Sequence, residues 1–189
     1  IRNKIIIQSR QKYTYAVFWM FGTVGSFTLM AIAGRELASH FDTFQILFWR
    51  SASGAIIVIS IISIYRWRNI QTQFLARHFL RNICHFASQY GWFYAIGFIP
   101  LAKVFAIEFT TPVWLALIAG IFLNEKVTLK RWLAIGLGFM GVLVVTRPGI
   151  GETNYGDIAV LGAAVGYAIV YAITKSVADK DKPLTILFY

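Results

Sequence analysis

Two charged residues, Arg50 and Glu108, interrupt apolar stretches of the chain, where an ionised side chain is costly. Glu108 lies in the segment KVFAIEFTTPVW, and Arg50 directly follows TFQILFW. Both lie at a similar depth, because each is six or seven residues from the expected outer end of its segment. Two hypotheses follow. Either the residues form an ion pair between two helices, or Glu108 faces a cavity, where it binds a cationic group or exchanges a proton.

Pro112, four residues after Glu108, predicts a kink in the same segment. Proline has no backbone N–H, and its ring clashes with the carbonyl four residues earlier. The Glu108 carbonyl therefore loses its helical partner and must face protein or water. Thr111 shares the helical face of Glu108, so its hydroxyl is a further candidate contact for a substrate.

A polar and aromatic stripe runs along the segment from residue 80 to residue 99. Its members are spaced as on one helical face: Arg81, His85, Ser88, Gln89 and Trp92. Gln89 offers an amide and Trp92 a ring that can stack on a cation. His85 is either a ligand residue or a histidine bonded to a neighbouring helix. Trp19 opens a weaker stripe in the first apolar segment, with helix packing as the alternative role.

These residues belong to segments that are long and apolar enough to cross a membrane. The chain is 58% hydrophobic, whereas soluble domains are about 45–50% apolar. A helical span needs about 20 apolar residues. Six segments qualify or nearly so, at residues 14–33, 44–64, 80–99, 101–123, 131–147 and 157–174. Because lipid cannot bond to the backbone, we predict an all-α integral membrane protein with six transmembrane helices in this chain.

The lysine and arginine residues predict the orientation of these helices. With a cytoplasmic N-terminus, 14 of them lie on the cytoplasmic side and only Arg35, Lys103 and Arg147 on the outer side. The positive-inside rule therefore predicts a multi-pass protein of a cell inner membrane or plasma membrane with its N-terminus in the cytoplasm. The net charge of +10 follows from this topology, and no nucleic-acid partner is expected.

The sequence lacks the patterns of the common enzyme and metal sites. Cys84 is the single cysteine, which excludes a disulfide framework. Walker, HExxH and Ser-His-Asp patterns are missing, so we expect neither an enzyme, a cofactor nor a metal. A membrane-embedded transferase remains an alternative, although the sequence lacks the metal-binding acids that it would need.

An internal similarity indicates two repeats. Residues 35–49 match residues 175–189 at a constant offset of 140, including ILF in both copies, with chance similarity as the alternative. Five spans separate the copies, so the second copy would be inverted, as in many secondary transporters. We assign residues 1–147 to a first five-helix repeat and residues 148–189 to the start of a second. Because Ile1 is not methionine and Tyr189 lies in an apolar run, the natural chain is expected to extend further.

The chain resembles the EamA family of the drug/metabolite transporter superfamily. The likeness rests on ILFWRSASGA and on the third to fifth spans, and its characteristic residues are Arg50, Pro112, Glu125, Arg131, Trp132, Gly136, Gly138 and Gly141. The resemblance implies a ten-helix bundle of two inverted halves with a central cavity for small metabolites. Within the family, the pattern looks close to members that take up S-adenosylmethionine, although amino-acid exporters share it.

These observations predict a secondary carrier that moves a small cationic or zwitterionic metabolite by alternating access. Its partners would be that metabolite and the lipid bilayer. The predicted substrate contacts are Glu108, Arg50, Gln89, Trp92, Thr111, His85 and Trp19. Two further alternatives are a half-size carrier that acts as a homodimer and an inactive remnant of a truncated gene.

Overall fold

The computed structural model describes residues 2–65, 70–122, 128–147 and 154–189. All regular secondary structure in these ranges is helical, which confirms the predicted all-α fold class. The helices are α1 (Arg2–Leu37), α2 (Thr43–Tyr65), α3 (Leu75–Phe98), α4 (Leu101–Glu108), α5 (Thr111–Phe122), α6 (Leu129–Thr146), α7 (Tyr155–Ala178) and α8 (Pro183–Phe188). Glu125 lies outside the described residues, and nothing is described of the Arg131 side chain.

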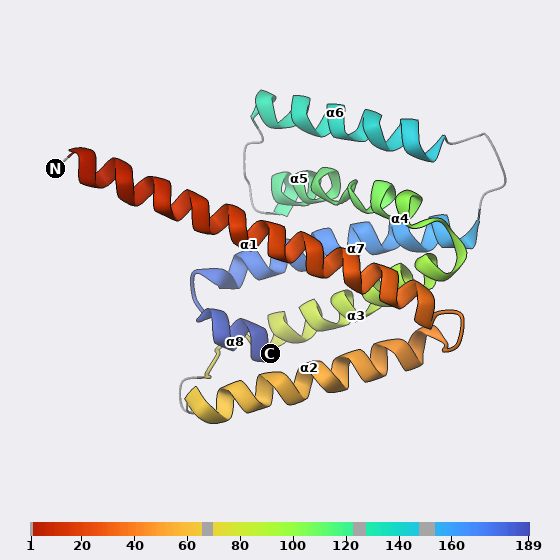
Figure 1. Ribbon diagram of the computed structural model, residues 1–189, viewed down its shortest axis with the longest axis horizontal. Coiled ribbons are helices and arrows are strands. Elements are labelled where there is room, and N and C mark those ends of the chain that lie inside the picture. The colour runs from red at the N-terminus through yellow and green to blue at the C-terminus, as the bar shows by residue number, and fades with distance from the viewer. Residues whose placement is uncertain (1, 66–69, 123–127, 148–153) are drawn as a thin grey trace.

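The long helices lie side by side and alternate in direction along the chain (Figure 1). The α1–α2 turn, the α3–α4 connection and the start of α7 gather at one end of the bundle. The chain's N-terminus, the starts of α3 and α6, and the α7–α8 turn gather at the other end. This up-and-down arrangement is the one that short connections between membrane-crossing helices require.

Four stretches of helix in the described part of the chain are long and apolar enough to cross a membrane: Thr14–Leu37, Thr43–Ile64, Leu101–Gly120 and Tyr155–Ala178. The fifth predicted span corresponds to a shorter apolar helix, Trp132–Thr146. The remaining predicted span forms α3, which begins before the expected residue 80. The polar stripe lowers the mean hydropathy of α3, so α3 is not among these four stretches. A helix that is buried within a bundle tolerates polar residues that a lipid-facing helix cannot.

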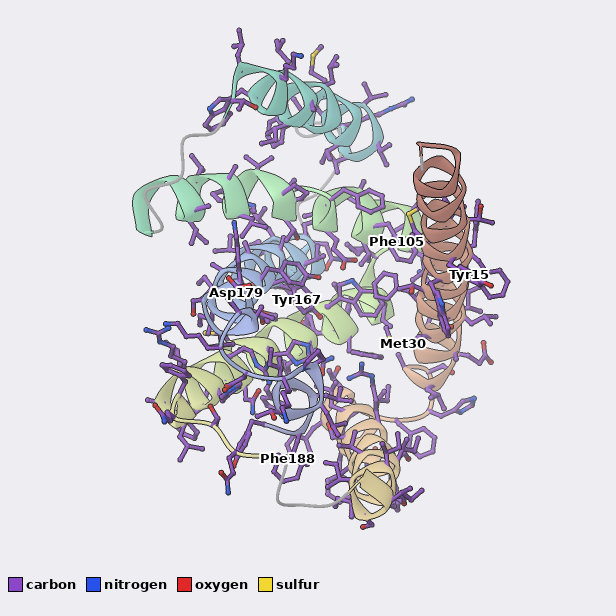
Figure 2. The ribbon with its side chains drawn as sticks, turned by 90° about the vertical axis from the view of Figure 1, so that its left-hand side faces the viewer. Tyr15, Met30, Phe105, Tyr167, Asp179 and Phe188 are labelled. Carbon is purple, nitrogen blue, oxygen red and sulfur yellow. The ribbon has the colours of Figure 1, made fainter. Side chains whose placement is uncertain are left out.

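Apolar side chains cover the outside of the bundle, as expected for an integral membrane protein. Phe18, Leu29, Ile64 and Leu137 are all more than two-thirds exposed. In Figure 2, Tyr15 points away from the other helices, whereas Met30 lies on the inner side of α1. An exposed apolar surface of this extent is stable in lipid and would aggregate in water.

The centre of the bundle is the contact between α3 and α7, which lie along each other for most of their length. Two glycines allow this approach. A Cβ at Gly91 on α3 would lie 2.8 Å from the Ala159 carbonyl oxygen of α7, and a Cβ at Gly166 on α7 would collide with Ser88 of α3. Small residues at such crossings let two backbones pack closely. The α3–α7 pair is therefore the most closely packed part of the fold, and the other helices lie around it.

Candidate functional site

A cavity of about 590 Å³ opens beside α3, between α1, α2, α4 and α7. It is lined by Trp19, Gly22, Thr23, Ser26, Phe27, Met30, Arg50, His85, Gln89, Trp92, Phe93, Glu108, Tyr167 and Tyr171. Pockets that hold small metabolites are typically about 300–1,000 Å³. Six of the seven predicted substrate contacts thus meet at one cavity, while Thr111 does not line it. Their role in binding stays a prediction.

Arg50 reaches the cavity from α2 and is held by α3. Its Nη1 donates a hydrogen bond to Gln89 Oε1 at 2.9 Å, and its guanidinium carbon lies 5.9 Å from the centre of the Phe93 ring. Gln89 is buried, so its amide is a fixed acceptor. The guanidinium carries five N–H groups, and those that Gln89 does not use are available to an anionic ligand.

Glu108 enters the cavity from the last residue of α4. Its Oε2 accepts a hydrogen bond of 2.7 Å from Trp92 Nε1. The Trp92 ring is only 1% exposed and packs against Phe27, Phe93 and Phe105. Trp92 is therefore a rigid donor that fixes the carboxylate. Within the described ranges, Oε1 has no recorded hydrogen bond, which leaves it available to a cation.

The hypothesis of an Arg50–Glu108 ion pair is wrong. Among the described residues, the ion pairs are His78–Asp181 and Lys103–Asp157. Arg50 and Glu108 instead bind two neutral side chains of α3, Gln89 and Trp92, which lie three residues apart on one helical face. The two opposite charges consequently line one cavity without neutralising each other.

The segment around Pro112 is interrupted as a helix. Helix α4 ends at Glu108, a turn covers residues 109–110, and α5 begins at Thr111. The Thr111 hydroxyl donates a 2.6 Å hydrogen bond to the Glu108 carbonyl oxygen, and so replaces the N–H that Pro112 lacks. Thr111 is buried and its hydroxyl is already used. The turn changes the helical register after Glu108, which is why Thr111 does not reach the cavity as we had expected.

His85 and Trp19 lie at the edges of the cavity. The His85 ring stands edge-on to the Tyr167 ring at 6.0 Å. Trp19 is 70% exposed and lies on α1 at the open side of the cavity. The weaker stripe that continues from Trp19, formed by Thr23, Ser26 and Met30, also lines the cavity. Both roles that the sequence allowed for this face, helix packing and substrate contact, stay predictions.

Two tyrosines of α7, Tyr167 and Tyr171, were missed by the sequence analysis although they line the cavity. They lie one helical turn apart in the segment GYAIVY, so they share a face. This spacing of two phenol groups inside an apolar span was the available signal. They add aromatic rings and hydroxyl groups opposite α1. Across the described chain, no group of three or more His, Cys, Asp or Glu side chains could hold a metal ion.

The comparisons with known proteins agree with a membrane carrier. The model of the EamA-like transporter family matches residues 14–147. The S-adenosylmethionine uptake transporter of Rickettsia bellii is 23% identical over 177 residues, which make up 94% of this chain and 61% of the relative. The corresponding transporter of Rickettsia prowazekii is also 23% identical over 177 residues and is covered to 60% of its length.

A second group of relatives is named for a different substrate. The riboflavin transporter of Brucella anthropi is 30% identical over 147 residues, or 76% of this chain and 51% of the relative. The chain thus spans between about half and about three fifths of the length of these relatives. No solved structure matches the chain.

Proposed function

The chain belongs to the EamA-like transporter family, and we propose that the whole protein carries a small zwitterionic or cationic metabolite across the membrane by alternating access. The family and the names of the relatives indicate a transporter rather than an enzyme. One observation carries the proposal. Arg50 and Glu108, two opposite charges, line the same cavity within membrane helices, and each is held by a neutral partner.

At one pole of the cavity, Arg50 would bind the carboxylate of a zwitterion. A guanidinium matches the geometry of a carboxylate with two parallel hydrogen bonds. The Gln89 amide fixes the guanidinium from the opposite side, so less conformational freedom is lost on binding. An unpaired arginine at membrane depth is otherwise costly, and a substrate carboxylate would relieve that cost.

At the other pole, Glu108 would bind the positive group of the substrate. Its free Oε1 supplies charge, while the exposed rings of Trp19 and Tyr171 supply faces that attract cations. Trp92 is too deeply buried to stack on a ligand, so it is assigned a positioning role. S-adenosylmethionine fits both poles, because it carries an amino-acid carboxylate and a sulfonium cation, and several relatives are named as its uptake transporters.

Riboflavin is the second candidate, and the aromatic lining of the cavity favours it. Phe27, Tyr167 and Tyr171 could enclose a flat uncharged ring system. Several relatives are named riboflavin transporters. This ligand would need neither Arg50 nor Glu108 as a counter-charge, so the two candidates respond differently to the same substitutions.

We further propose that the protein is a ten-helix bundle of two inverted repeats, with the first repeat at residues 1–147 and the second beginning at residue 148. The α1–α2 and α7–α8 turns support this division. Helix α2 begins at Thr43 and α8 at Pro183, at the offset of 140 found in the sequence. The two turns lie at opposite ends of α3 in Figure 1, as inverted copies would.

The backbone hydrogen bonds of the two turns also correspond. The bond from Phe41 N to Leu37 O matches that from Asp181 N to Val177 O at the same offset. The bonds from His40 N to Leu37 O and from Ile46 N to Asp42 O have counterparts at Lys180–Val177 and Ile186–Lys182. If the similarity between the two segments were due to chance, their turns would not be expected to share this hydrogen-bond pattern.

The distribution of positive charge supports an N-terminus in the cytoplasm of a bacterial-type inner membrane. The starts of α3 and α6 and the α7–α8 turn lie at the same end of the bundle as the N-terminus (Figure 1). The basic residues of these segments are Arg77, Arg81, Lys130, Lys175, Lys180 and Lys182. We assign this end to the cytoplasmic side, following the positive-inside rule.

The test is an uptake assay with the full-length protein in proteoliposomes, using radiolabelled S-adenosylmethionine, lysine and riboflavin. We expect saturable uptake of S-adenosylmethionine. Glu108→Gln should lower it at least about ten-fold, because losing a charge-assisted contact costs about 1.5–3 kcal/mol. Saturable riboflavin uptake that is unchanged in Glu108→Gln would favour the second candidate. No uptake of any of the three compounds by correctly inserted protein would contradict the proposal.

A further inference from the structure

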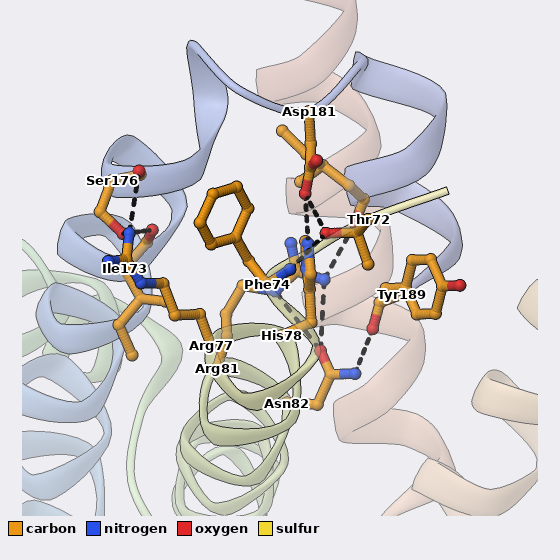
Figure 3. A network of polar contacts seen from close by, with 11 residues as sticks. Thr72, Phe74, Arg77, His78, Arg81, Asn82, Ile173, Ser176, Asp181 and Tyr189 are labelled. Atoms are coloured by element: carbon orange, nitrogen blue, oxygen red, sulfur yellow. Dashed lines mark hydrogen bonds and ion pairs between the residues drawn. The ribbon is translucent and has the colours of Figure 1, made fainter. Parts of the chain in front are cut away.

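A second polar cluster lies at the cytoplasmic end of α3, away from the cavity (Figure 3). His78 Nε2 lies 2.8 Å from Asp181 Oδ2, and the Thr72 hydroxyl donates a 2.6 Å hydrogen bond to the same oxygen. His78 is 2% exposed and Asp181 9% exposed. The cluster joins the beginning of α3 to the short connection between α7 and α8.

Two more contacts hold α8 against the first turns of α3. Arg81 Nη2 donates a 2.9 Å hydrogen bond to the Ile186 carbonyl oxygen, and Asn82 Nδ2 donates to the Tyr189 carbonyl oxygen. Two side chains of α3 are thus bonded to backbone carbonyls of α8 and of the residue that follows it. These side chains can change partner without any change in the α3 backbone.

The α7–α8 connection and α8 lie between two cavities along α3. The 590 Å³ cavity ends at His85. A surface cavity of about 690 Å³ reaches Thr72, Phe74, Lys180 and Asp181. His78 and His85 lie seven residues apart on one helical face, which corresponds to about 10 Å.

The face between these two cavities is polar. Arg81 and Asn82 lie on it and donate to the carbonyl oxygens of Ile186 and Tyr189. This face continues the stripe formed by His85, Gln89 and Trp92. If α8 moved away, a polar path would connect the cavity with the cytoplasmic surface.

We propose that the α7–α8 connection is the cytoplasmic gate of the cavity and that the His78–Asp181 pair, with Thr72, is its latch. Opening would separate Asp181 from His78 and move α8 away from Arg81, so that substrate passes along the polar face of α3. The gate rests on the proposed transport function.

The contrast with the α3–α7 contact explains why movement would occur at this place. The α3–α7 crossing is closed by backbone contacts at Gly91 and Gly166, and sliding it would disrupt packing over most of both helices. The connection at residues 179–182 is held against the start of α3 by a few polar bonds. Gate movements in proteins commonly use such element ends as hinges.

The first test measures access to the cavity from the cytoplasmic side. Ser26→Cys, in a Cys84→Ser background, places one thiol in the cavity lining. Inside-out vesicles are treated with a membrane-impermeant maleimide. His78→Gln and Asp181→Asn should each increase the labelling rate at least five-fold. The matched control is Asp179→Asn, the same chemical change at an exposed position two residues away, and it should not change the rate.

The second test locks the proposed gate. Thr72→Cys with Asp181→Cys, again in the Cys84→Ser background, brings two thiols to positions whose side chains touch. Oxidation should stop uptake of S-adenosylmethionine, and reductant should restore it. Uptake by the oxidised protein at the reduced rate, or equal labelling of Asp181→Asn and Asp179→Asn, would overturn the gate. Because labelling needs no substrate, a protein without uptake but with the expected labelling would refute only the transport proposal.

Discussion

The two polar regions along α3 differ in the partners to which their charged side chains are bonded. In the central cavity, Arg50 and Glu108 are each bound to a neutral side chain and do not meet. At the start of α3, His78 and Asp181 are bonded directly to each other. A charge that is held by a neutral partner keeps its capacity to bind a ligand. In a directly bonded pair each group is already satisfied, and removing one partner leaves the other buried and unpaired. The difference separates the proposed binding region from the proposed gate on one helix.

The largest expected effect is a difference in protein stability between substitutions in the two regions. His78→Gln and Asp181→Asn should lower the Tm of the detergent-solubilised protein by several degrees, because each leaves a buried polar partner behind. Arg50→Gln and Glu108→Gln should lower Tm less, since neither removes an ion pair and the new amide can still donate to Gln89 or accept from Trp92. The measurement is thermal unfolding followed by intrinsic fluorescence, with Asp179→Asn as the control. A large loss of Tm in Arg50→Gln would mean that the cavity charges are structural.

A smaller effect is expected for the residue that positions Glu108. Trp92→Phe keeps an aromatic ring in the core but removes the N–H that bonds to Glu108 Oε2. A single hydrogen bond contributes about 1 kcal/mol, so substrate affinity should fall roughly five-fold. Binding of radiolabelled S-adenosylmethionine to purified protein measures it. Unchanged affinity would show that the carboxylate is positioned without Trp92.

The smallest effect is the response of the latch to pH. Hydrogen bonds from Thr72 and His78 hold the pKa of the Asp181 carboxyl below its ordinary value of 3.8. A lowered pKa in the folded state means that this stabilisation is complete above the ordinary value and is lost as pH falls through the folded value. The Tm difference between the natural protein and Asp181→Asn should therefore stay constant in the neutral range and shrink only in strong acid.

A different pH profile would identify a different source of stability. Loss of the Tm difference within the neutral range would contradict a latch whose pH response is set by the lowered pKa of the Asp181 carboxyl. His78 Nδ1 is buried and has no hydrogen-bond partner among the described residues.

Much of the fold and part of the site could be predicted from the sequence because helical periodicity is regular. The stripe from His85 to Trp92 predicted one face of α3, and the structure places that face at the cavity. The same rule failed for Thr111, because the turn at residues 109–110 ends the regular spacing. A proline predicts such an interruption but not the register after it.

Other features depend on contacts that no local pattern encodes. Whether Arg50 bonds to Glu108 or to Gln89 is decided by how three helices pack and by side-chain rotamers. The His78–Asp181 bond joins residues 103 positions apart, and each residue alone resembles an ordinary polar residue near a helix end. Tyr167 and Tyr171 resemble the aromatic residues that many spans carry, so their position in the cavity appears only once α7 is placed against α3.

The most direct test of the central claim is a comparison of two ligands on two proteins. S-adenosylmethionine and its decarboxylated analogue differ in the carboxylate that Arg50 is proposed to bind. Dissociation constants for both ligands should be measured with the natural protein and with Arg50→Gln. We predict that the substitution raises the dissociation constant of S-adenosylmethionine at least about ten-fold, or 1.4 kcal/mol. The dissociation constant of the decarboxylated analogue should not change. An equal increase in both dissociation constants, or an increase in neither, would contradict the proposal that Arg50 binds the carboxylate.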